Sequence, residues 1–331
     1  MATLLATEKM PPELVRRIEA RLGRPWRTAD ALQGGWTRSR WIAVARLLAV
    51  VLVSGTVALV VRAVRRSRAE LNAARSELLD EQRRRTHGLV AADRDYLERI
   101  QGWLSKLAGP YEGDSVSLEL RPPGALDALF ARPIAYVHGP LGGFANSASI
   151  AATASTSFKD ALLLCLVAPP ASRAEKVVLA RVLAAYRGGA SVEQETPRVR
   201  LLQEAFAGWP FAVGPWTSRV LDAAGPAEVD RLGRDLRGAP VERAVQAAHA
   251  DLLLAAMDEP GPPGGPTELD GERPHDVRLC VVELTTARTL LRVRRRVDPN
   301  WISTSRRSDY AAGLDQCALA FDVVQNVVAT R

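Results

Sequence analysis

Residues 41–61 read WIAVARLLAVVLVSGTVALVV, and Arg46 is the one charged residue among these 21 positions. A helix of this length reaches about 30 Å, which is the thickness of the hydrocarbon core of a bilayer. Arg46 lies near the start, where a long side chain can extend to the lipid headgroups. The run shows no polar face, as a helix on the surface of a domain would. We therefore expect a transmembrane helix over residues 41–61, and a buried core helix of a soluble protein is the alternative.

Aromatic and basic residues flank this apolar run on both sides. Tryptophan and arginine concentrate at the two interfaces of a membrane-spanning segment. The residues expected at the membrane interfaces are Trp36, Trp41, Arg46, Arg62, Arg65, Arg66 and Arg68. A cleavable signal peptide would begin nearer Met1 and would have a shorter apolar core. The pattern therefore predicts a permanent single-pass anchor in contact with a lipid bilayer.

The arginines do not by themselves orient this anchor, because residues 21–40 and residues 62–81 each contain five. Export of a basic tail of forty residues is unfavourable, so we expect the N-terminus inside and the C-terminal domain outside. Only four of the 44 basic residues are lysines, which is typical of GC-rich bacterial coding. These features together predict the inner (plasma) membrane of a bacterium, with a periplasmic or extracytoplasmic C-terminal domain in the cell envelope.

The formal charge of +7 is concentrated near the apolar run. Of the 44 Lys and Arg and the 37 Asp and Glu, 20 and 11 fall in residues 1–111, which leaves 24 and 26 for residues 112–331. Basic residues beside a membrane segment face anionic headgroups. A protein that binds nucleic acid carries its positive charge on the domain that contacts the nucleic acid. We therefore expect no nucleic-acid partner.

The chain is expected to have four parts: an N-terminal tail over 1–40, the transmembrane helix over 41–61, a helical stalk over 62–110 and a globular domain over 111–331. The tail contains a short amphipathic helix that begins at Pro11–Pro12. In the stalk, apolar residues recur at the three-four spacing of a coiled coil at Leu97, Ile100, Leu104 and Leu107. Packing of that helix on the next domain explains the same spacing. A coiled coil, or small residues in the membrane helix, would support a homodimer.

In residues 111–331 short apolar runs alternate with helical patterns, which predicts an α/β (or α+β) domain with a mixed sheet. The expected strands cover residues 115–120, 133–138, 162–168, 276–284 and 289–297. The expected helices cover residues 173–186, 197–207, 217–236, 240–258 and 306–328. Residues 259–275 are rich in proline and glycine, so we expect an exposed loop there.

The turn HGPLGG over residues 138–143 is the main candidate for chemistry, and its candidate ligand-contacting residues are His138, Gly139, Gly142 and Gly143. It resembles the His-Gly oxyanion loop of α/β-hydrolases, but the Gly-x-Ser-x-Gly nucleophile motif that such enzymes need is absent from the sequence. Phosphate-binding glycine patterns are absent as well. A ligand site at this turn would require His138, Lys159, Asp160 and a further carboxylate to converge in one pocket.

The histidines and cysteines are too widely spaced for a zinc or haem motif, so we predict no metal, no cofactor and no catalytic residues. Cys165 and Cys280 lie in apolar runs expected to be strands, where a buried thiol behaves as a small hydrophobe. If the domain is exported, one pair among Cys165, Cys280 and Cys317 could form a disulfide and leave the third cysteine free.

The segment GWPFAVGPW over residues 208–216 contains Trp209, Phe211 and Trp216 between glycines and prolines. We expect a loop whose aromatic rings cover the core of the domain, and a surface for a protein partner is the alternative. Taken together, the sequence favours a non-enzymatic membrane protein that presents its α/β domain for protein–protein interaction. A membrane-tethered enzyme or small-ligand-binding domain that uses the His138–Gly143 turn is the second hypothesis.

Overall fold

The computed structural model of the chain describes residues 12–23, 38–89, 93, 95–187, 192, 194–213, 215–261 and 273–329. Contacts between residues divide the chain into two compact units, Met1–Asn72 and Ala73–Arg331. We describe the two units separately. Trp36 lies outside the described residues, as do residues 262–272 of the loop rich in proline and glycine.

The first unit contains helix α1 (Pro12–Leu22) and most of helix α3 (Arg38–Arg85). The predicted membrane segment is helical and lies within α3. Its large apolar side chains are uncovered, with Leu47, Leu52 and Leu59 each more than two-thirds exposed. The most apolar window of α3 has a mean hydropathy of 2.4, and none of it is buried. Among the described residues, α3 is a helix long and apolar enough to cross a bilayer by itself.

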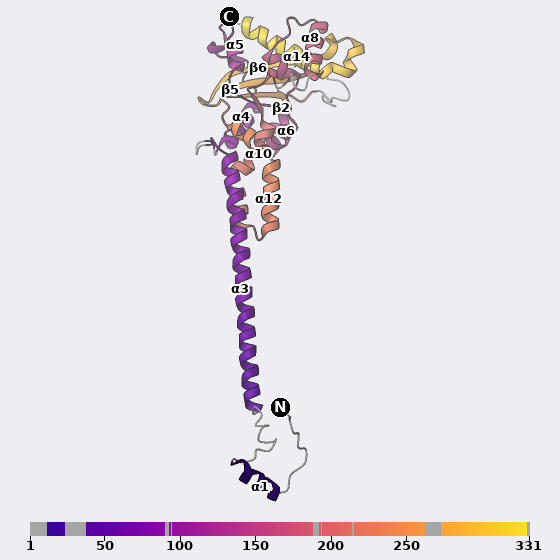
Figure 1. Cartoon of the computed structure of the whole chain (residues 1–331). Coiled ribbons are helices and arrows are strands. Elements are labelled where there is room, and N and C mark those ends of the chain that lie inside the picture. The colour runs from indigo at the N-terminus through magenta and orange to yellow at the C-terminus, as the bar shows by residue number, and fades with distance from the viewer. Residues whose placement is uncertain are drawn as a thin grey trace. The chain divides into compact units, whose positions relative to one another are not determined.

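The second unit is an α/β domain with a mixed sheet of six strands, in which helices cover both faces (Figure 1). Its strands are β1 (Ser115–Val116), β2 (Ile134–Pro140), β3 (Val199–Leu201), β4 (Leu252–Asp258), β5 (His275–Glu283) and β6 (Arg288–Val297). Its helices are α4 (Tyr96–Leu107), α5 (Ala125–Phe130), α6 (Ser147–Thr156), α7 (Ala161–Val167), α8 (Glu175–Arg187), α10 (Leu202–Ala212), α11 (Pro215–Asp222), α12 (Pro226–Gly238), α13 (Val241–Ala248) and α14 (Thr304–Ala329). Short 3₁₀ turns are η2 (Leu118–Leu120), η3 (Leu141–Phe144) and η4 (Pro299–Trp301).

The strand order is β1-β6-β5-β4-β2-β3. Strands β2, β3 and β4 are parallel, whereas β5 pairs antiparallel with β4 and with β6. In the central pair the register places His138 opposite Ala256 and Pro140 opposite Asp258. The carboxyl ends of β2 and β4 therefore meet at one edge of the sheet.

Alternate residues of β2 and β4 belong to two separate hydrophobic cores. Tyr136 and Leu254 face the layer made by α5, α7, α8 and α14. Val137 and Leu253 face the layer made by α4, α6, α10 and α13. Successive side chains of a strand point to opposite faces, so a strand buried on both faces reads as a continuous apolar run.

This two-sided burial explains two wrong predictions of secondary structure. Residues 252–258 were expected to continue a helix from residue 240, but they form β4, and the helix ends at Ala248. Conversely, residues 162–168 were expected to be a strand but form α7, because the Asp160 side chain caps this helix by accepting a hydrogen bond from the backbone N–H of Leu163 at 3.0 Å. Periodicity alone cannot distinguish a buried strand from a buried helix in a short apolar run.

Of the other predicted elements, some have the predicted type and others are split into two shorter elements. The strands near residues 133–138, 276–284 and 289–297 and the helices near 173–186 and 306–328 are confirmed. The expected helix over 217–236 is interrupted before Pro226 and forms α11 and α12. The expected helix over 197–207 begins with the short strand β3, and the expected strand over 115–120 is β1 followed by a 3₁₀ turn.

The end of α3 packs within the second unit. Leu78 is buried, and the Arg85 guanidinium donates to the Ala239 carbonyl at 2.9 Å and to Glu242 Oε2 at 2.7 Å. Gln82 donates to the Phe211 carbonyl at 2.6 Å. Three of the four residues at coiled-coil spacing in α4, Ile100, Leu104 and Leu107, are also buried in the domain core. Residues 73–107 are therefore part of the compact unit.

Two glycines inside helices provide a test of this packing. A Cβ at Gly208 in α10 would lie 2.6 Å from the backbone oxygen of Pro240, whereas a Cβ at Gly102 in α4 would meet nothing within 4 Å. We predict that Gly208→Ala lowers the free energy of unfolding of the full chain in detergent by about 1–3 kcal/mol, because α10 and α13 must separate. Gly102→Ala should raise it by about 0.5–1 kcal/mol, because alanine favours the helix. Urea titration measures both, and equal effects would contradict the packing described.

Candidate functional site

The candidate site surrounds His138, near the carboxyl end of β2. Three other side chains reach its ring or its partners from neighbouring elements. Asp258 ends β4, Asp160 caps the N-terminus of α7, and His275 begins β5. In open α/β sheets, ligands commonly bind beyond the carboxyl ends of parallel strands. The topology therefore places His138 where functional groups of this fold class are usually found.

Both ring nitrogens of His138 face carboxylates. Nε2 lies 3.0 Å from Asp258 Oδ1, and Nδ1 forms a short contact with Asp160 Oδ2. The second carboxylate oxygen of Asp160 accepts a hydrogen bond from the Tyr136 hydroxyl at 2.8 Å. Asp258 also faces His275 Nε2 at 3.6 Å. We call these five residues the His138 cluster.

Burial and charge act in opposite directions on the His138 cluster. Burial alone would lower the pKa of His138, but the negative charges of Asp258 and Asp160 outweigh it and raise the pKa well above its usual value. For Asp258, burial would raise the pKa, and the charge and hydrogen bond of His138 instead lower it. Burial would lower the pKa of His275, but its interaction with the Asp258 carboxylate outweighs burial and raises the pKa. At neutral pH the centre is therefore an imidazolium held between two carboxylates.

This arrangement differs from that of a histidine that acts as a general base. A base needs one nitrogen free to take a proton from a nucleophile, and here both nitrogens are engaged. The Ser157 hydroxyl is buried, and its Oγ accepts a hydrogen bond from the backbone N–H of His138 at 3.0 Å. In the part of the chain that the structure describes, no group of three or more His, Cys, Asp or Glu could hold a metal ion.

The glycines of the His138–Gly143 turn pack against helix α6. A Cβ at Gly139 would lie 2.3 Å from Thr153 Cγ2, and one at Gly143 would lie 2.1 Å from Thr153 Oγ1. A Cβ at Gly142 would meet nothing within 4 Å. Close packing of the turn on Thr153 thus accounts for two of the three glycines without a ligand.

The convergence required for a ligand site is met in part. Asp160 and the carboxylate of Asp258 reach His138, whereas the amine of Lys159 donates to the Thr196 carbonyl at 3.3 Å. Asp258 and His275 bound the loop that the sequence showed only as rich in proline and glycine. A polar residue directly after a buried apolar run, as at Asp258, is the signal that could have identified it.

Two of the cysteines form a disulfide between helices that cover the same face of the sheet. Cys165 of α7 and Cys317 of α14 form a disulfide with a Cα–Cα distance of 5.1 Å. Cys165 lies in a helix, so its expected position in a strand was wrong. Cys280 is a free and buried thiol in β5, and burial raises its pKa to about 11. Such a thiol remains protonated and unreactive at neutral pH.

The aromatic segment is helical up to Ala212, which corrects the expectation of a loop. Trp209 and Trp216 are 5% and 3% exposed, and only Phe211 of the three is partly exposed. Trp209 packs on Tyr96 with ring centroids 5.5 Å apart. Pro210 lies inside α10, in its last turn. The two tryptophans thus cover the core and offer little surface to a partner.

The described residues expected at the membrane interfaces all lie on α3 and are exposed. Trp41 is 63% exposed, and Arg66 pairs with Glu70 at 3.0 Å. The others are Arg46, Arg62, Arg65 and Arg68. Their spacing along the helix leaves the apolar run between two polar ends.

The charge state of the His138 cluster predicts how stability depends on pH. Because the folded pKa of His138 is raised, its contribution is complete below the unfolded value of about 6.5 and is lost as the pH rises through the folded value. The folded pKa of Asp258 is lowered, so its contribution is present above about 3.9 and is lost as the pH falls through the folded value. Chemical unfolding of the full chain between pH 5 and 10 should show the alkaline loss, and its extension below pH 4 should show the acid loss.

His138→Gln should lower the free energy of unfolding at neutral pH by about 3 kcal/mol, because it leaves two carboxylates without their cation. It should also remove part of the alkaline loss seen in the wild type. His249→Gln is the matched control, since that histidine is exposed and lies 3.8 Å from Asp93, and it should cost less than about 1 kcal/mol. Equal costs for the two variants would refute a buried imidazolium.

Comparison of the chain with known protein families, curated proteins and solved structures finds no match.

Proposed function

We propose that this chain is a single-pass membrane protein that presents its α/β domain outside the cytoplasm for contact with a protein partner, without catalysis. The observation that carries the proposal is the uncovered apolar surface of α3. The large side chains of this segment are exposed from Trp41 to Val64. Apolar patches of this extent do not remain in water on soluble proteins.

The balance of free energy favours insertion of this segment. Leucine, isoleucine and valine at the centre of a membrane helix each contribute about −0.3 to −0.6 kcal/mol on insertion. Leu47–Val61 contains no charged residue, and Arg46 lies close enough to one end to reach the headgroups. Helix hydrogen bonds also satisfy the backbone groups, as a bilayer requires.

The Cys165–Cys317 disulfide supports an extracytoplasmic domain. Disulfides persist in oxidising compartments and are rare where glutathione and thioredoxin keep thiols reduced. The positive residues on either side of α3 left the orientation undecided. With an oxidised domain, the N-terminal tail is inside the cell and residues 73–331 are outside.

Two features favour protein contact as the role of the domain: the ring nitrogens of His138 are already engaged, and the net charge of residues 112–331 is nearly neutral. The His138 ring contacts carboxylates on both nitrogens. The nearly neutral net charge of residues 112–331 also gives no support to a nucleic-acid partner.

The position of the His138 cluster favours a second candidate function, a membrane-tethered domain that binds a small ligand at the His138–Gly143 turn. Asp258 is about one-quarter exposed, so its carboxylate is the accessible member of the cluster. A ligand with a hydrogen-bond donor would find an acceptor there, beyond the carboxyl ends of β2 and β4.

Membrane anchoring is tested by fractionation. We predict that the full chain sediments with membranes after high-speed centrifugation and an alkaline wash. The double variant Leu52→Arg, Val53→Arg should shift it toward the supernatant, because two arginines at the centre oppose insertion by about 6 kcal/mol. Arg46→Leu is the control and should stay with the membrane. A wild-type chain that remains soluble without detergent would overturn the anchor.

The disulfide and the orientation are tested by counting thiols. Chain extracted from membranes and denatured without reductant should react with one maleimide-linked polymer, at Cys280, and after reduction with three. Cys165→Ser should react twice without reductant, because Cys317 loses its partner. Three reactive thiols in the unreduced wild type would place the domain in the cytoplasm.

A further inference from the structure

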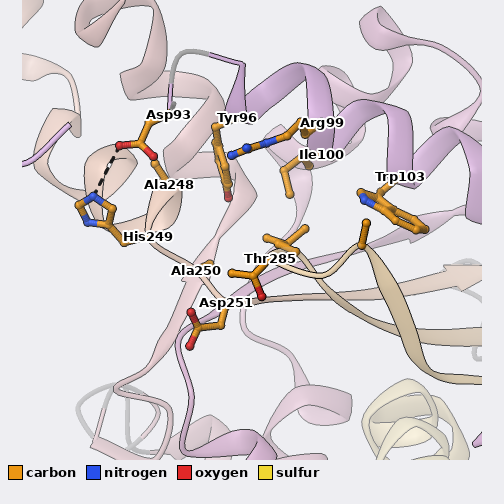
Figure 2. Close-up of a pocket in the computed structure, with 12 residues that line it drawn as sticks. Asp93, Tyr96, Arg99, Ile100, Trp103, Ala248, His249, Ala250, Asp251 and Thr285 are labelled. Atoms are coloured by element: carbon orange, nitrogen blue, oxygen red, sulfur yellow. Dashed lines mark ion pairs between the residues drawn. The ribbon is translucent and has the colours of Figure 1, made fainter. Parts of the chain in front are cut away.

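A pocket of about 420 Å³ lies at the amino end of β4, at the opposite end of this strand from Asp258. Figure 2 shows α4 on one side of the pocket and the segment that joins α13 to β4 on the other. The turn between β5 and β6 contributes the remaining wall. The volume lies in the range of sites for small molecules.

The Tyr96 hydroxyl is a buried polar group without a hydrogen-bond partner among the described residues. The residue is 1% exposed, and its ring is held against Trp209. In Figure 2 the hydroxyl points away from α4, toward the side of the pocket where Ala250 and Thr285 lie. Buried hydroxyls nearly always have a partner. Burial raises the pKa of Tyr96, so the phenol stays protonated and can donate.

Part of the pocket lining is apolar. Ile100, Ala248 and Ala250 line it and are buried. Trp103 and Leu284 are partly buried beside them. A hydrocarbon or aromatic body would remove this surface from water.

The charged groups of the pocket differ in whether they are already paired. Asp251 lies 3.6 Å from Arg132, and Asp93 lies 3.8 Å from His249. In the part of the chain that the structure describes, the Arg99 guanidinium has no ion-pair partner. Arg99 follows Tyr96 by three residues, so both side chains lie on one face of α4. The Tyr96 hydroxyl and the Arg99 guanidinium are therefore donors left for a ligand, and the Thr285 hydroxyl, which also lines the pocket, can donate or accept.

Ala287, in the turn that closes the pocket, has a φ of 56° and is the only non-glycine residue with positive φ in the described residues. L-residues with a Cβ rarely adopt this conformation, and strained residues cluster at binding sites. The strained backbone of Ala287 is an observation independent of the Tyr96 hydroxyl, and both residues line the same pocket.

We propose that this pocket binds a small monocarboxylate with an aromatic or apolar body. The body packs on Ile100 and Trp103, and the carboxylate accepts hydrogen bonds from the Tyr96 hydroxyl and the Arg99 guanidinium. This site is separate from the His138 cluster and does not depend on the function proposed above.

The test uses the full chain in detergent and titration calorimetry with phenylacetate as the probe. We expect saturable binding of one phenylacetate per chain. Phenethylamine, which has a similar body and the opposite charge, and acetate, which lacks the body, should bind at least tenfold more weakly. Tyr96→Phe and Arg99→Gln should each weaken phenylacetate binding about three- to tenfold. Arg234→Gln, an exposed arginine on α12, should leave the affinity unchanged.

A second readout separates a binding role of Tyr96 from a structural one. Tyr96→Phe keeps the ring and its contact with Trp209, so the variant without ligand should melt at the same temperature as the wild type or higher. A lower melting temperature would show that the hydroxyl is satisfied in the free protein and would overturn the proposal. Equal binding of phenylacetate and phenethylamine, or an unchanged affinity of Tyr96→Phe, would also overturn it.

Discussion

Strands β2 and β4 pair in parallel at the centre of the sheet, and both of their faces are covered by helices. This pairing determines where every candidate group of the domain lies. Its carboxyl end brings together His138 and Asp258, and its amino end forms one wall of the pocket beneath Tyr96. Both strands are buried on both sides, and their charged side chains, His138 and Asp258, lie near the carboxyl ends.

The His138 cluster is best understood as a connection between elements distant in sequence. Asp160 caps α7 with one oxygen and holds His138 with the other. Asp258 joins the end of β4 to the start of β5 through His275. A buried charge without a partner is costly, whereas a cation between two carboxylates can be retained. The same contacts engage both nitrogens of the His138 ring.

The two ends of β4 therefore differ in what they offer a ligand. At the carboxyl end, the polar groups satisfy one another. At the amino end, the buried Tyr96 hydroxyl has no hydrogen-bond partner and the Arg99 guanidinium has no ion-pair partner among the described residues, and both lie beside apolar side chains. A small anion with an apolar body would complement such a site, because its charge would accept from the donors and its body would cover the apolar side chains. The apolar helix α3 and this pocket are thus independent features, one set by hydropathy along the chain and the other by tertiary contacts.

The sequence by itself determined the apolar helix, the mixed α/β class, the β5–β6 hairpin and the final helix, because each depends on periodicity or on a continuous apolar run. It pointed to His138 through the turn that follows β2, and to Asp160 as a neighbour. Only the tertiary structure decided that residues 162–168 are helical and residues 252–258 extended, because both are short buried runs whose type depends on which neighbours they pair with. It also decided the Cys165–Cys317 disulfide and the pocket at Tyr96. Both bring together residues far apart in the chain, and the local sequence pattern does not indicate which distant residues come into contact.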